Sequence, residues 1–192
     1  MPPADPGSLV RRAEGAGGVH HGRVDDGDGF EAFVAVETPR LLRVAYGLTG
    51  NPHDAWDLVQ ESLVRVGVRW RRLHDQNPGG YAQTVLVRLD VDRHRRRRRE
   101  TPSDRAVVAD RPVELDAPID PALVAALAVL PARQRAAVVL RTVEDLDHAA
   151  IAERLGCSAP TARTHLRRGL ARLRDLLAAA DTDAEEEVRP RA

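Results

Sequence analysis

An acidic, proline-rich segment divides this 192-residue chain into two stretches with helical periodicity. Residues 100–121 contain four prolines, six acidic residues and two arginines, and their apolar residues follow no sustained spacing. This composition predicts an extended linker rather than a packed element. Because such a linker separates folding units, the chain is expected to form two small domains.

On both sides of the linker, apolar residues recur every three or four positions, which is typical of amphipathic helices. Residues 30–99 contain all six aromatic residues and are interrupted by turns at 50–52 and 77–80, so they are predicted to form a three- or four-helix bundle. Residues 122–177 contain shorter helical stripes. The predicted fold class is therefore all-α, with residues 1–29 a disordered extension and residues 178–192 an acidic tail.

The charge of the chain is unevenly distributed. Its 29 arginines balance 29 acidic residues, and a net charge of zero by itself argues against a protein that binds polyanions. Residues 30–99 and 122–174, however, each have a net charge of +5, whereas segments 1–29, 100–121 and 175–192 have −2, −4 and −4. Both helical blocks are basic, so nucleic acid remains a candidate ligand.

The strongest local motif lies in residues 147–173. Asp147 caps a short helix with the small residue Ala152 at its centre, and Gly156 supplies a turn. Ser158 caps a longer helix, which completes the pattern of a helix-turn-helix. Hydroxyl groups and a helix N-terminus bind phosphate, and arginine pairs with guanine edges, so this second helix is predicted to bind DNA. The residues assigned to its DNA-binding face are Ser158, Thr161, Arg163, Thr164, Arg167 and Arg168.

A second basic segment ends the first block, where residues 88–99 contain seven arginines and two aspartates. Arginines neutralise phosphates, and the aromatic residues Trp70 and Tyr81 just upstream suit stacking with unpaired bases. Trp70 also falls on an apolar stripe, so a place in the core is its alternative role.

The two blocks resemble regions 2 and 4 of sigma factors of the sigma-70 family, in particular the extracytoplasmic-function group of actinobacterial type. The resemblance rests on DLVQE at residues 57–61, on the basic helix, and on LPARQR at residues 130–135 ahead of the helix-turn-helix. It covers residues 30–99 and 122–176, in the family's order and with a linker of suitable length.

This resemblance implies a protein that binds core RNA polymerase at the β′ clamp helices and the β flap, recognises the −10 and −35 promoter elements and promotes DNA opening. The helix-turn-helix would read the −35 element, and the linker would thread toward the polymerase active centre. The implied polymerase contacts are Asp57, Leu58, Val59, Gln60 and Glu61. The implied −10 contacts are Trp70, Asn77, Tyr81, Arg88, Asp92, Arg93, Arg95 and Arg96. An anti-sigma factor is a further candidate partner.

Four residues depart from the family pattern. Trp56 stands where an acidic residue is usual, Gly67 where an aromatic is common, Arg88 where asparagine is frequent, and Ala162 where valine is usual. The first three concern the block that would bind polymerase and the −10 element, so they bear on promoter preference more than on the fold.

Two other functions are open at this point. A free-standing helix-turn-helix regulator would bind duplex DNA without polymerase, but it gives no reason for the DLVQE segment or the basic helix. A nucleic-acid enzyme would need a carboxylate cluster, a metal set or a phosphate loop, and none can be assigned. The chain is therefore expected not to be an enzyme and to need neither a cofactor nor a metal.

Location and redox chemistry follow from what the sequence lacks. Cys157 is the one cysteine, so it cannot form an internal disulfide; it is expected to be a small buried residue, with redox sensing as the alternative. A metal site at His20 and His21 would lack further ligands. With no signal-peptide pattern and no apolar run of about 18 residues, the expected location is the cytoplasm.

Overall fold

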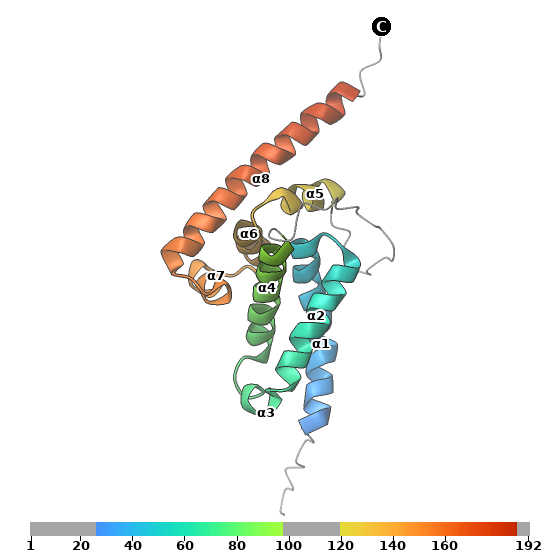
Figure 1. The fold of residues 1–192 in the computed structure, drawn as a ribbon, viewed down its shortest axis with the longest axis vertical. Coiled ribbons are helices and arrows are strands. Elements are labelled where there is room, and N and C mark those ends of the chain that lie inside the picture. Colours follow the sequence, from blue (N-terminus) through green and yellow to red (C-terminus); the bar gives the residue numbers. More distant parts are fainter. Residues whose placement is uncertain (1–25, 98–119, 188–192) are drawn as a thin grey trace, which may run out of the picture.

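The structure, a computed structural model, describes residues 26–97 and 120–187, and the side chains of residues 29–97 and 120–180. Within these ranges every element is an α-helix (Figure 1), which confirms the predicted all-α class. The helices are α1 (Asp26–Thr49), α2 (Pro52–Gly67), α3 (Trp70–Leu73), α4 (Pro78–Arg97), α5 (Pro121–Val129), α6 (Ala132–Glu144), α7 (His148–Leu155) and α8 (Ala159–Glu187).

Helices α1, α2 and α4 form the first bundle, in which their apolar stripes meet. The turn between α1 and α2 depends on Gly50, whose φ is 65°, and on the cap residue Asn51. The Asn51 side-chain oxygen accepts hydrogen bonds from the backbone N–H groups of His53 and Asp54 at 2.9 and 3.1 Å, and Pro52 begins the helix. Fully buried residues of this core include Leu41, Val44, Leu48, Leu58 and Leu86.

Three aromatic rings attach the short helix α3 to α1. The ring centroid of Trp70 lies 5.3 Å from that of Phe30 and 5.2 Å from that of Phe33. Trp70 therefore packs against the edge of the core, as its apolar stripe allowed, but remains partly exposed. Gly67, the last residue of α2, leaves space for this cluster, because a Cβ there would lie 3.0 Å from Phe30 Cζ.

Helices α5 to α8 form the second block, with α8 packed along α6. The two helices approach closely at Gly169, where a Cβ would lie 2.7 Å from Val138 Cγ2 and 3.0 Å from the carbonyl oxygen of Gln134. Any larger residue at position 169 would push α8 off α6. Residues 135–140 of α6 are all buried, so this helix has no exposed face over its central turns.

The two blocks pack directly on each other, which the sequence did not predict. Helix α6 contacts α1 and α4, and α7 contacts α4 (Figure 1), so the buried apolar residues of both blocks form one continuous core. Gly47 of α1 permits a close approach to α6, since a Cβ there would lie 3.1 Å from Val139 Cγ2. The two blocks thus form one packed body, although the sequence divides into two units.

Three expectations differ from the structure. Helix α1 begins at Asp26 rather than at residue 30, because acidic residues in a first turn are favourable for the helix dipole. Helix α8 continues to Glu187 instead of ending near residue 177, because no glycine or proline follows until Pro190. Cys157 is only partly buried.

Several predicted segments lie outside the described residues. These are the disordered extension up to residue 25, with His20 and His21, the greater part of the linker, and the last residues of the tail. Among the described helices, none combines the length and the apolar composition that crossing a membrane requires.

The Asn51 cap generates a stability prediction. Asn51→Ala removes both side-chain hydrogen bonds at the start of α2 and should lower the free energy of unfolding by about 1 kcal/mol. Urea denaturation followed by circular dichroism measures this. Gln60→Ala, an exposed change in the same helix, is the control and should stay within about 0.5 kcal/mol of wild type; equal midpoints for the two variants would contradict the capping role.

Candidate nucleic-acid interface

The local geometry of residues 147–173 is that of a helix-turn-helix. The Asp147 side chain accepts a hydrogen bond from the backbone N–H of Ala150 at 2.8 Å and so caps α7. Gly156 ends α7 in the left-handed conformation, with φ 62°, and the Cys157 N–H donates to the Ala152 carbonyl at 3.0 Å. Ser158 Oγ accepts from the Thr161 N–H at 3.4 Å at the start of α8. The predicted caps and turn are all confirmed.

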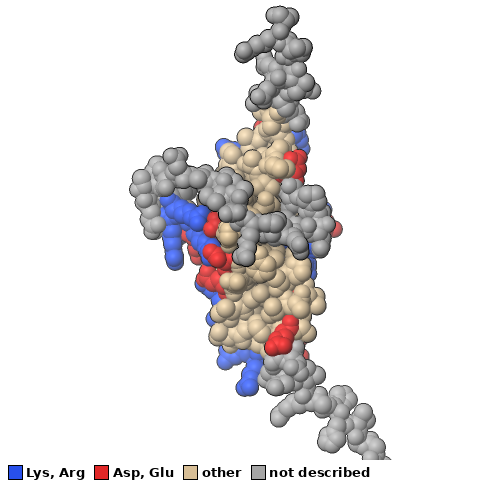
Figure 2. Space-filling model, turned by 90° about the vertical axis from the view of Figure 1, so that its right-hand side faces the viewer, with Lys and Arg blue, Asp and Glu red and all other residues tan. Residues whose placement is uncertain are grey.

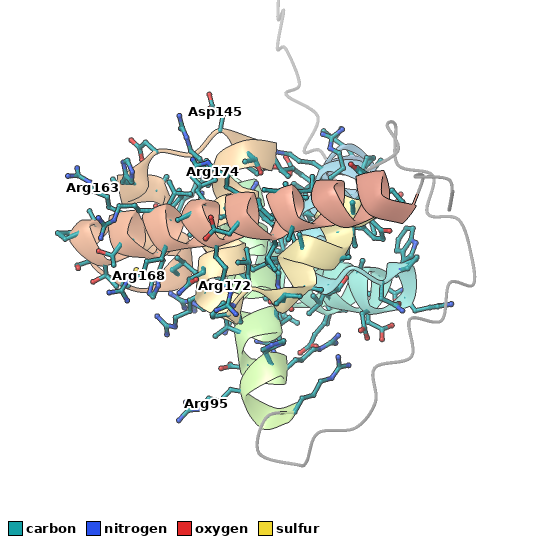
Figure 3. All side chains as sticks on the ribbon, turned by 90° about the horizontal axis from the view of Figure 1, so that it is seen from above. Arg95, Asp145, Arg163, Arg168, Arg172 and Arg174 are labelled. Carbon is teal, nitrogen blue, oxygen red and sulfur yellow. The ribbon has the colours of Figure 1, made fainter. Side chains whose placement is uncertain are left out.

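One face of α8 is buried and the opposite face carries the predicted DNA contacts. Ala162, Leu166 and Leu173 point into the core. Of the predicted residues, five are exposed, and Thr164 is partly buried with its hydroxyl donating to the Pro160 carbonyl at 2.9 Å. Figure 3 shows Arg163 and Arg168 near the beginning of α8, with Arg172 and Arg174 further along it. The exposed residues are Ser158, Thr161, Arg163, Arg167 and Arg168.

His165 lies beside this surface and responds to its positive charge. Partial burial lowers the pKa of the His165 imidazole, and the charges of Arg133 and Arg168 lower it further. The imidazole is therefore neutral at physiological pH and adds no charge to the basic face.

The predicted −10 contacts fall into two groups along α4. Trp70, Asn77 and Tyr81 lie at its beginning, whereas the arginines lie toward its end; fourteen helical residues from Tyr81 to Arg95 span about 21 Å. In Figure 3, Arg95 projects at the end of α4, well away from the arginines of α8. The eight predicted −10 residues therefore lie in two places on the molecule.

At the beginning of α4, two of the predicted residues already have structural partners. The Asn77 side-chain oxygen accepts from the Gly80 N–H at 2.8 Å, so Asn77 is a helix cap. The Tyr81 ring is partly buried, and the Arg69 guanidinium carbon lies 5.9 Å from its centroid.

Nearby, a hollow of about 700 Å³ between α1 and α3 combines aromatic rings with exposed guanidinium groups. Its lining residues are Phe30, Gly67, Val68, Arg69, Trp70, Arg71 and Arg72.

The end of α4 is a cationic surface. Arg88, Asp92, Arg95 and Arg96 are exposed, whereas Arg93 is half-buried and forms an ion pair with Glu61 at 3.3 Å. The face of the molecule in Figure 2 is largely uncharged, and its basic side chains gather toward the margins. On this face, the basic side chains are thus localised rather than spread evenly.

The predicted polymerase contacts on α2 divide between the surface and the core. Leu58 and Val59 are fully buried, because they belong to the apolar stripe of α2, so this structure does not expose them for direct contact. Asp57 and Gln60 are exposed, and Glu61 pairs with Arg65 at 2.6 Å as well as with Arg93.

Sequence reasoning missed two exposed apolar residues of the same helix. Trp56 is 42% exposed and Val64 is 65% exposed, and with Gln60 they form a stripe of every fourth residue along α2. The sequence pattern that could have identified them is the four-residue spacing of Trp56, Gln60 and Val64. This spacing places them one position along the helix from the buried stripe. We name these three residues the α2 stripe.

Fold and surfaces together define a DNA-binding protein with a helix-turn-helix block and a second helical block. Comparison with known proteins adds its family: residues 33–100 match sigma-70 region 2 and residues 121–173 match sigma-70 region 4. The chain belongs to the sigma-70 family, in the extracytoplasmic-function group. It is therefore a sigma factor, which binds core RNA polymerase, recognises −10 and −35 promoter elements and promotes DNA opening. The family consists of transcription initiation factors rather than enzymes.

Individual relatives agree with this placement. The chain is 36% identical to an RNA polymerase sigma-E factor of Streptomyces coelicolor, over 84% of this chain and 95% of that protein. It is 37% identical to the extracytoplasmic-function sigma factor SigE of Mycolicibacterium smegmatis, over 78% of this chain and 62% of that protein. Both are actinobacterial, as the resemblance implied. Region 2 ahead of region 4 has no place in the hypothesis of a free-standing regulator.

A solved structure has the same fold. The sigma factor RpoE from Bartonella quintana, crystallised in complex with the anti-sigma factor NepR, superposes with a TM-score of 0.65. The superposition covers 78% of this chain and 96% of that chain, at 24% sequence identity.

The depressed pKa of His165 generates a prediction of pH dependence. As the pH falls through about 6.5, the unfolded chain binds a proton at His165 before the folded chain does, so folding stability decreases. His165→Gln should remove this contribution. Thermal unfolding of both proteins at about pH 7.5 and about pH 5.5 measures it, and parallel losses in the two proteins would contradict the assigned shift.

Proposed function

We propose that three separate surfaces of this sigma factor divide the work of initiation. The exposed face of α8 reads the −35 element, the α3–α4 surface engages the −10 element, and the exposed side of α2 binds core polymerase. The observation that carries the proposal is that these surfaces lie on different helices and that each has its own chemistry: a cationic α8 face, a cationic and aromatic α3–α4 surface, and an apolar and acidic α2 face.

For the −35 element, the support is the arrangement of α8. Its beginning carries hydroxyl groups and exposed guanidinium groups, while Ala162 and Leu166 anchor the helix from behind. Such a helix can enter a major groove with its first turns toward the bases. Phosphate contacts from Ser158 or the helix N-terminus would set the register, and arginine contacts to guanine would provide sequence preference.

For the −10 element, the support is the combination of aromatic rings with cations around α3. The hollow bounded by Phe30, Trp70 and exposed arginines offers both stacking surfaces and phosphate partners for single-stranded DNA. The arginines at the end of α4 would hold the adjacent backbone. DNA opening is then driven by the binding of unpaired bases, with no covalent step and no catalytic residue.

For polymerase, the support is the α2 stripe together with Asp57. Trp56 and Val64 expose apolar surface that solvent does not favour, and aromatic residues at the centre of an interface commonly provide much of its binding energy. Leu58 and Val59 contribute by fixing α2 in the core.

We also propose an anti-sigma factor as a regulatory partner and the cytoplasm, where promoter DNA is transcribed, as the place of action.

Runoff transcription with core polymerase on a randomised promoter library tests the function as a whole and yields the promoter. Initiation from a recurrent pair of elements is expected. A protein that binds duplex DNA but never directs core polymerase to a start site would contradict the proposal.

The α8 surface yields a variant test on the promoter so obtained. Arg163→Ala, Arg167→Ala and Arg168→Ala combined should weaken binding to duplex with the −35 element by about tenfold or more, and each lost phosphate contact should reduce the salt slope by about one. Fluorescence anisotropy across a salt series measures both quantities. Arg174→Ala, an exposed arginine further along α8, is the single-charge control; a loss per removed charge equal to that of the triple variant would show that only general charge matters.

The α2 stripe yields a separate test. Trp56→Ala with Gln60→Ala should weaken binding to core polymerase by about thirtyfold, or about 2 kcal/mol, as removal of an aromatic anchor does. DNA binding by the free protein should not change. Val36→Ala, which alters an apolar residue of α1 that is 74% exposed, is the control. Unchanged polymerase affinity of the double variant would remove α2 from the proposed interface.

A further inference from the structure

Another hollow lies where α4 meets α6 and α7, three helices that all pack on one another (Figure 1). Its volume is about 300 Å³, at the lower end of the range for small-molecule sites, which is roughly 300–1,000 Å³. We name it the α4–α7 hollow. The side chains that line it are Val87, Arg88, Val91, Asp92, Arg133 and Leu155.

Two guanidinium groups from different helices line this hollow. Arg88 lies in the middle of α4 and Arg133 in the first turn of α6, and both residues are exposed. In the part of the chain that the structure describes, neither group has a hydrogen-bond or ion-pair partner. Guanidinium groups bind phosphate oxygens through pairs of parallel hydrogen bonds, so two unpartnered ones at a single hollow suit a phosphate monoester.

The Arg88 side chain reaches from α4 to the end of α7. Its Nη2 atom lies 3.6 Å from the position that a Cβ on Gly156 would take. Gly156 has a φ of 62°, a left-handed conformation that favours glycine, and the missing side chain leaves the rim of the hollow open at this point. The Arg88 guanidinium therefore borders the hollow on the α7 side.

The charge around the hollow favours an anion. Among the lining side chains, Arg88 and Arg133 are basic and Asp92 is acidic, which gives a local net charge of +1. Positive charge also extends from Arg133 toward α8: partial burial lowers the pKa of His165, and the charges of Arg133 and Arg168 lower it further. An anionic ligand is thus attracted more strongly than a neutral or cationic one.

The walls of the hollow suit a flat ring. Val87 and Leu155 are buried residues of α4 and α7, and Val91 is partly buried, so apolar surface comes from two helices. Apolar walls with a few fixed polar groups are typical of sites for small organic molecules. The Asp92 carboxylate accepts hydrogen bonds and so suits the hydroxyl or amine donors of such a molecule.

We propose that the α4–α7 hollow binds a nucleoside monophosphate. Arg88 and Arg133 hold the phosphate, the base lies against the apolar walls, and Asp92 accepts hydrogen bonds from the ribose hydroxyls. The proposal rests on the residues of this hollow and not on the promoter or polymerase surfaces. It gives the sigma factor a small-molecule site that involves both helical blocks.

The first experiment locates the nucleotide by nuclear magnetic resonance. The full chain with ¹⁵N-labelled glycine is titrated with AMP, GMP, CMP and UMP. Gly156 borders the α4–α7 hollow, whereas Gly67 borders the hollow between α1 and α3, whose aromatic and cationic residues form the alternative site. With at least one nucleotide, the amide signal of Gly156 should shift saturably and at lower concentration than that of Gly67. The reverse order, or no saturable shift of Gly156 with any nucleotide, would overturn the proposal.

The second experiment measures the affinity of variants for the nucleotide so found, by isothermal titration calorimetry. Arg88→Ala and Arg133→Ala should each raise the dissociation constant about tenfold, the usual effect of losing a charged hydrogen bond. Arg95→Ala removes another exposed arginine of α4, one that does not line the hollow, and should match wild type. All three positions are exposed, so the fold should be retained. Equal losses in Arg88→Ala and Arg95→Ala would show general charge attraction and contradict the site.

The two parts of the ligand provide a last test. Inorganic phosphate and the free nucleoside should each bind at least about tenfold more weakly than the nucleotide, because each lacks either the apolar contact or the charged one. Phosphate that bound as tightly as the nucleotide would remove the role of the apolar walls. A nucleoside that bound as tightly would remove the role of the two arginines, and either result would overturn the proposal.

Discussion

Burial of α6 on every side is the constraint on which the rest of this structure depends. Six consecutive residues, 135–140, are inaccessible, because α8 covers one face of the helix while α1 and α4 cover the others. The small side chains of Ala136 and Ala137 permit close packing, and Gly47 and Gly169 remove the Cβ atoms that would hold α1 and α8 away. Since α6 belongs to both cores, its position determines where α8 presents its arginines and which part of α4 is covered.

Much of the fold was accessible from the sequence, because local rules dominate in a helical chain. Asp147, Gly156 and Ser158 mark helix ends by hydrogen-bonding and conformational preferences that act over a few residues. Periodicity also identified most of the core. It could not identify contacts between blocks, since an apolar face shows that a helix needs a partner but not which partner. Glu144, at the end of α6, illustrates the limit: an acidic residue near a helix end is ordinarily solvated, but this side chain is buried and accepts hydrogen bonds from Arg40 Nε of α1 and Gln83 Nε2 of α4.

The candidate site was predicted unevenly for a similar reason. On α8, exposure and periodicity agree, and most of the residues predicted to bind DNA lie on the exposed side. On α2, the stretch at residues 57–61 was taken as one contact surface, although adjacent helical residues point in different directions. Leu58 and Val59 therefore turned out to be core residues, and Trp56 and Val64 are the exposed ones. Charge counting had a similar limit, because Arg135 and Arg154 contribute to the +5 of their block yet are buried in contacts within the protein.

The length and composition of α8 give this helix an electrical polarity. It has 29 residues, or about 43 Å, and extends beyond the rest of the molecule in Figure 1. Arginines populate its first half, and the acidic residues of the sequence follow from Asp175 onward. This order is opposite to the one that stabilises a helix, because it adds to the macrodipole instead of compensating it. In the field of a polyanion such a rod experiences a torque that turns its arginine end inward and its acidic end outward, so α8 can be oriented before it touches a groove.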